Sequence, residues 1–75
     1  MAILVDFQIT REDETQVEYR FGYPEMDRHL VIEKSSLAGN PVDGMVDRAY
    51  SAVLAKILRL HRDRESWPKG GTYAA

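Results

Sequence analysis

The sequence contains no cysteine and no long hydrophobic run. Without cysteine no disulfide can reinforce the fold, and the absence fits a protein of a reducing compartment. The apolar run from Met1 to Val5 stops at Asp6 and is too short for a secretory signal peptide. No stretch approaches the roughly 20 apolar residues that a membrane span needs. We therefore expect a cytoplasmic protein without a membrane contact.

The chain also lacks the size for a large interior. A domain of 75 residues buries only about 60 to 65% of the surface that its unfolded chain exposes, so we expect no sizeable internal active-site cavity. At this length the gain from apolar burial and the loss of chain entropy nearly cancel. Self-association or a docked tail would supply the missing stabilisation.

Neither sign of charge dominates, but the two signs are unevenly distributed. The formal net charge is −2 at pH 7. Residues 1–33 carry three basic and eight acidic side chains, a net charge of −5, whereas residues 34–75 carry seven basic and four acidic ones, a net charge of +3. The sequence is therefore acidic in its first half and mildly basic in its second half.

Alternating hydrophobicity predicts three strands in the acidic half. Residues 3–10 and 15–23 place apolar side chains at every second position, the period of a half-buried strand. The four consecutive charged residues 11–14 are expected to form the hairpin connection between them. Pro24 ends the second strand because it has no backbone donor, and a third alternating run covers residues 28–34. The short connections favour an antiparallel meander, since a crossover between parallel strands needs about a dozen residues.

A period of 3.6 residues predicts one amphipathic helix from about Pro41 to about Arg64. Asn40 provides a side-chain oxygen for the N-cap, and Pro41 suits the first helical position. Cations concentrate in the last turns, where they complement the negative end of the helix dipole. Apolar residues recur at spacings of three and four: Val42, Met45, Val46, Ala49, Tyr50, Val53, Leu54, Ile57 and Leu60.

Together these elements predict an α+β fold. Its fold class is a three-stranded antiparallel β-meander followed by one C-terminal amphipathic helix, in the order βββα, packed on one face of the sheet. Residues 1–65 are expected to form this single domain, and residues 66–75 a C-terminal tail that contains Trp67, Tyr73 and two glycines. The βββα order is shared by unrelated proteins, so the order by itself identifies no function.

No motif indicates an enzyme, a cofactor or a metal site. Two alternating patterns of acids with a histidine are present: Glu25, Asp27 and His29, and His61, Asp63 and Glu65. Side chains two residues apart share one side only in an extended segment, and the second pattern lies at a helix end, where they diverge. The serines and threonines lack an elbow-type or glycine-rich phosphate motif. We therefore expect a non-enzymatic protein without cofactor or metal.

The leading hypothesis is a protein-interaction module that forms a homodimer. The apolar arc of the predicted helix is wider than one small sheet can cover, and a three-stranded sheet has two open edges that native proteins cover, charge or pair. Two-fold dimers are the commonest oligomers, which favours a dimer over a monomer, and the expected partner is a second copy or another protein. The predicted partner-binding residues are Tyr50, Leu54, Leu58, Trp67 and Tyr73. The alternative is a monomer whose tail covers the same flank of the helix.

A second hypothesis is weak nucleic-acid binding through the basic end of the helix. The predicted phosphate-contacting residues are Lys56, Arg59, Arg62, Arg64 and Lys69. Against it, the sequence pI is about 5.6, and the outward face of the predicted sheet carries acids that repel phosphates. The strand aromatics share the inward register with Val17, so they are expected in the core rather than on a stacking surface. Nucleic acid is therefore the less favoured partner.

Overall fold

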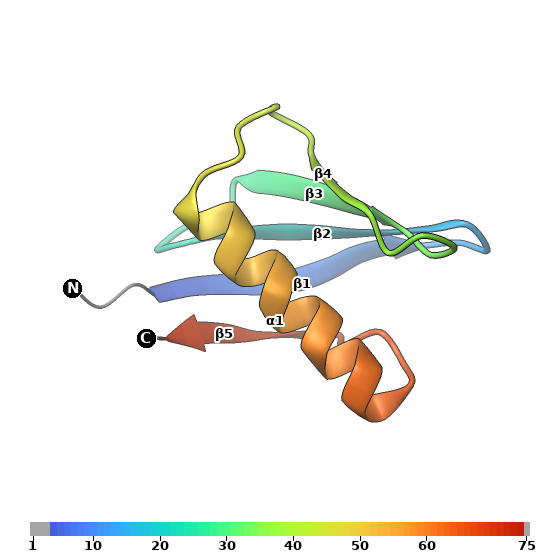
Figure 1. Cartoon of the computed structure of the whole chain (residues 1–75). Helices are drawn as coiled ribbons and strands as arrows, with labels where there is room; N and C mark the ends of the chain where they lie inside the picture. The colour runs from blue at the N-terminus through green and yellow to red at the C-terminus, as the bar shows by residue number, and fades with distance from the viewer. Residues whose placement is uncertain (1–3, 75) are drawn as a thin grey trace.

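A computed structural model describes residues 4–74 as a five-stranded antiparallel sheet with one helix across one of its faces (Figure 1). The elements are β1 Leu4–Glu12, β2 Gln16–Gly22, β3 Arg28–Glu33, β4 Gly39–Pro41, α1 Arg48–Arg64 and β5 Gly70–Ala74. The strand order is β4-β3-β2-β1-β5. The α+β class, the antiparallel sheet and the single helix are confirmed. The predicted number of three strands is wrong, because β4 and β5 extend the meander at its two edges.

The first three strands bury the face that the alternating pattern predicts. Val17, Tyr19 and Phe21 of β2 are each 0% exposed, and Leu30 and Ile32 of β3 lie beside them on the same face. The full core adds Val5, Phe7, Tyr50, Val53 and Ile57. The core is thus a single layer of side chains between α1 and one face of the sheet. The opposite face of the sheet carries mainly polar side chains.

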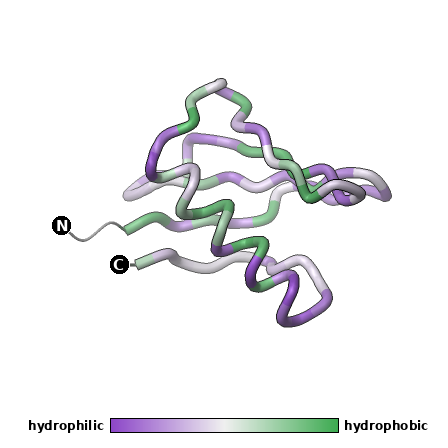
Figure 2. The backbone as a smooth tube through the Cα atoms, in the orientation of Figure 1, coloured by the Kyte–Doolittle hydropathy of each residue, from purple (hydrophilic) through white to green (hydrophobic). Residues whose placement is uncertain are grey.

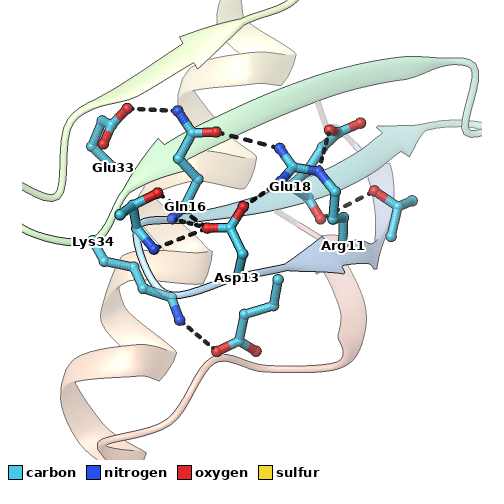
Figure 3. Close-up of polar contacts among 9 residues, drawn as sticks. Arg11, Asp13, Gln16, Glu18, Glu33 and Lys34 are labelled. Carbon is cyan, nitrogen blue, oxygen red and sulfur yellow. Dashed lines mark hydrogen bonds and ion pairs between the residues drawn. The ribbon is translucent and has the colours of Figure 1, made fainter.

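The connection between β1 and β2 is shorter than the sequence predicts. Arg11 belongs to β1 rather than to a turn, because β1 continues past a bulge near Thr10 and pairs Arg11 with Glu18. Asp13 then forms the turn: its Oδ1 accepts hydrogen bonds from the backbone N–H groups of Thr15 (2.9 Å) and Gln16 (2.7 Å). Figure 3 shows these bonds together with the ion pair between Arg11 and Asp13, which measures 2.6 Å. The polar groups at this end of the sheet thus bind one another and fix the turn.

Hydrogen bonds from Thr15 and Gln16 lower the pKa of Asp13 from its usual 3.8 to about 2. A carboxylate whose pKa is lower in the folded protein contributes stability above pH 3.8 and loses that contribution as the pH falls toward 2. We expect Asp13→Asn to reduce the free energy of unfolding most at about pH 5. At about pH 2 the difference in this free energy between the variant and the wild type should be smaller. Urea denaturation at both pH values measures this difference. A difference that stays constant with pH would contradict the prediction.

The helix begins seven residues later than predicted. Asn40 and Pro41 pair with β3 as part of β4, and the N-cap is Asp47, whose Oδ1 accepts from the backbone N–H of Tyr50 at 3.0 Å. The segment before Asp47 turns at Gly44, which has a φ of +75°. The predicted C-terminal end at Arg64 is confirmed. Along α1 the apolar and polar residues alternate in the pattern expected for a helix with one buried face (Figure 2).

Residues of the predicted tail form the fifth strand. β5 pairs antiparallel with β1, from Gln8 opposite Gly70 to Leu4 opposite Ala74. The segment that leads to β5 is held by the hydroxyl of Tyr19, which donates to the carbonyl of Pro68 at 2.6 Å inside the core. Burial raises the pKa of Tyr19, and the nearby charge of Glu12 adds to this effect. Residues 70–74 of the predicted tail are therefore a strand of the sheet.

Candidate interaction surfaces

A groove lies beside α1. It has a volume of about 500 Å³ and is lined by Leu37, Ala55, Leu58, Arg59, His61 and Arg62. We call it the helix-flank groove. Leu37, from the turn between β3 and β4, is 43% exposed and has a φ of +60°. A left-handed conformation costs a residue with a Cβ atom about 1 kcal/mol, and strained residues of this kind cluster at binding sites.

The five predicted partner-binding residues lie at different depths. Tyr50 is 4% exposed and belongs to the core. Leu54 and Leu58 are half-buried against that core, and Leu58 also lines the helix-flank groove. Trp67 is half-buried as well, and its ring stacks on His61 with the ring centres 3.9 Å apart. Tyr73 is half-buried on β5. The structure thus places Leu58 in the groove lining beside His61, the stacking partner of Trp67, and it places Tyr50 in the interior.

A second candidate surface is the loop of residues 42–46 between β4 and α1, here called the projecting loop. It extends away from the sheet and the helix at the top of Figure 1. Val42 is 66% exposed, Met45 53% and Val46 71%. The sequence predicted these three residues to lie on the buried face of a helix, and that prediction is wrong because the helix starts after them. Exposed apolar side chains in such close sequence are typical of an interaction site.

Arg28 anchors the projecting loop. Its guanidinium donates to Asp43 (2.8 Å), to both carboxylate oxygens of Asp47 (2.9 and 3.1 Å) and to the carbonyl of Met45 (3.1 Å). It also lies 4.7 Å above the centre of the Phe21 ring. The hydrogen bond from Arg28 lowers the pKa of Asp43; that of Asp47 is lowered first by the N–H of Tyr50 and further by Arg28. The apolar side chains of the loop are thus displayed on a fixed backbone.

The cations of the nucleic-acid hypothesis do not form one continuous patch. Arg59 and Arg62 line the helix-flank groove, whereas Lys56 shares a smaller pocket with Arg59 and Tyr73. Lys69 lines a depression with Asp6 and Gln8 on the outer face of the sheet. Arg64 is the last residue of α1. Phosphate binding needs cations that track one backbone, and this arrangement gives such binding little support.

The two acid and histidine patterns also separate in the folded chain. Glu25 and Asp27 line a depression with Arg28, while the Nδ1 atom of His29 lies 3.2 Å from Glu18 on the neighbouring strand. The imidazole ring of His61 stacks on Trp67. Within residues 4–74, no group of three histidine, aspartate or glutamate residues is arranged to hold a metal ion.

Comparison of the chain with models of protein families, with curated proteins and with solved structures found no match. In the described part of the chain, the helix is neither long enough nor apolar enough to cross a membrane.

Proposed function

We propose that this protein is a non-enzymatic interaction module that forms a homodimer, in which the projecting loop of each copy enters the helix-flank groove of the other. The observation that carries the proposal is the exposure of Val42, Met45 and Val46 on an anchored loop. A two-fold axis makes both contacts identical, as in most soluble dimers.

The two surfaces complement each other in polarity and in charge. The loop presents three apolar side chains, and the groove offers Leu37 and Leu58 as apolar contacts. Asp43 and Asp47 carry two negative charges against the one positive charge of Arg28, which leaves a net charge of −1 there, whereas Arg59 and Arg62 of the groove carry positive charges. Such charge pairs contribute mainly to the specificity and rate of association, whereas burial of the apolar side chains supplies the affinity.

The expected dimer is weak. Each aliphatic side chain that becomes fully buried contributes about 1.5 to 3 kcal/mol, and the loop residues are already partly covered in one copy. The loss of rotational and translational freedom offsets much of the gain from the two contacts. We therefore expect a dissociation constant on the order of 10 µM.

The test is Val46→Asp, measured by sedimentation velocity over about 1 µM to about 1 mM protein. We expect the variant to raise the dissociation constant of the dimer about 100-fold, because a carboxylate would have to leave water to enter an apolar groove. Its fold should be unchanged, since Val46 is 71% exposed. Tyr23→Asp is the matched control: Tyr23 is 59% exposed and lies in neither surface, so it should dimerise as wild type does.

A complementation experiment tests the reciprocal arrangement. Ala55→Asp blocks the groove and leaves the loop intact, while Val46→Asp blocks the loop and leaves the groove intact. A mixture of the two variants retains one intact contact for each heterodimer, so the mixture should associate more strongly than either variant alone. A wild-type chain that stays monomeric to about 1 mM, or a mixture that associates no better than its components, would refute the proposal.

A further inference from the structure

β5 forms the free edge of the sheet in the described part of the chain. The N–H of Ile9 on β1 donates to the carbonyl of Lys69 at 2.8 Å. Because backbone bonds of an antiparallel pair alternate along each strand, the next bonded partners of β1 are Gly71 and Tyr73. The backbone N–H and C=O groups of Gly70 and Thr72 therefore point away from β1, toward an open side of the sheet.

This edge lacks the usual protection against pairing. Native edge strands are blunted by charged side chains, proline or bulges, and β4 at the opposite edge contains Pro41. β5 reads Gly70, Gly71, Thr72, Tyr73 and Ala74, without charge or proline, and it pairs in regular register with β1. An extended segment could therefore continue the sheet beyond β5 by backbone hydrogen bonds.

A cationic pocket lies beside this edge. It has a volume of about 130 Å³, enough for a single side chain, and is lined by Ala55, Lys56, Arg59 and Tyr73. None of the ion pairs between residues 4 and 74 involves Lys56 or Arg59. A strand added at β5 would direct alternate side chains to the helix side of the sheet, where the pocket lies. The complementary side chain there is a carboxylate.

We propose that the edge of β5 binds an extended segment of another protein that places a glutamate or aspartate against Lys56 and Arg59. The backbone of Gly70 and Thr72 supplies the affinity, and the pocket supplies the selectivity. A second copy of this chain fits poorly, since β5 has no acidic side chain and a second helix would bring like charges to the same junction. The pocket adjoins the helix-flank groove and shares Ala55 and Arg59 with it, so peptide binding has to be measured apart from dimerisation.

The test uses the full chain with Val46→Asp as background, so that peptide binding is measured apart from dimerisation. The probes are two acetylated, amidated heptapeptides of threonine and valine, one with a central glutamate and one with a central lysine. In an NMR titration we expect the amide signals of Gly70 and Thr72 to shift, and the glutamate peptide to bind about tenfold more tightly than the lysine peptide.

Two substitutions separate the backbone contribution from the charge. Thr72→Pro removes an outward N–H that bonds nothing in β1, so it should abolish binding, whereas Thr72→Ala keeps that N–H and should bind. Lys56→Glu should reverse the preference in favour of the lysine peptide, while Arg48→Glu, elsewhere on α1, should leave it unchanged. Equal binding of both peptides, shifts outside residues 70–74 and α1, or a dimer that Thr72→Pro alone dissociates would each overturn the proposal.

Discussion

Replacement of Gly22 by alanine is expected to lower the free energy of unfolding by about 3 kcal/mol. Gly22 has a φ of +145°, a conformation that residues with a Cβ atom rarely adopt. An added Cβ would also collide with the carbonyl oxygen of Glu25 and lie 3.3 Å from the Cα of Met26. Both neighbours are backbone atoms of the turn between β2 and β3, so they cannot move aside cheaply.

Gly44→Ala is the matched control for this prediction. Gly44 also has a positive φ, +75°, but an added Cβ would meet no atom within 4 Å. Its substitution by alanine should therefore lower the free energy of unfolding only by the energy of the left-handed conformation, about 1 kcal/mol. Chemical denaturation of both variants measures the difference. Since small domains are stabilised by only about 5 kcal/mol, Gly22→Ala should lose more than half of the total. Equal losses of stability at the two positions would contradict the prediction, because they would show that the turn between β2 and β3 adjusts to the added methyl group.

Arg28→Ala should lower the free energy of unfolding by about 2 to 3 kcal/mol and weaken the proposed dimer. The side chain is 19% exposed and binds two carboxylates and one carbonyl that all belong to the loop or to the N-cap of α1. Its loss leaves Asp43 and Asp47 close together without a cation and frees the projecting loop. A loop that must be ordered on binding associates more weakly than a fixed one.

Two further variants distinguish anchoring from charge. Arg28→Lys keeps the charge but cannot reproduce the planar guanidinium that reaches several acceptors, so it should recover less than half of the loss. Arg20→Ala removes an exposed arginine that binds Gln8 on the outer face, and it should cost within about 0.5 kcal/mol. Denaturation gives the stabilities, and sedimentation gives the dimer constants. If Arg28→Ala behaved as Arg20→Ala does, the anchoring role would be wrong.

The candidate surfaces were only partly foreseeable from the sequence. Leu58 was predicted for partner binding, and it lines the helix-flank groove. The projecting loop was missed because Asn40 and Pro41 form as good a helix start as Asp47 does. Gly44, which is unfavourable inside a helix, was the local signal against the earlier start. No sequence signal places Leu37 in the groove lining, because the positive φ of this leucine does not follow from its neighbours in the sequence.

The elements with a regular hydrophobic period, β1 to β3 and the body of α1, follow from the sequence. Alternation placed Val17, Tyr19 and Phe21 on one face of the sheet, and a 3.6-residue stripe defined the body of α1, because these patterns bury apolar area in only one way. Only tertiary contacts account for β4 and β5, and they select the start of α1 from two local signals. Glycine-rich β5 has little strand propensity and forms because β1 supplies its partners. At the start of α1, Gly44 disfavours a helix from Pro41, and Arg28, distant in the sequence, binds Asp43 and Asp47 and so stabilises the start at Arg48.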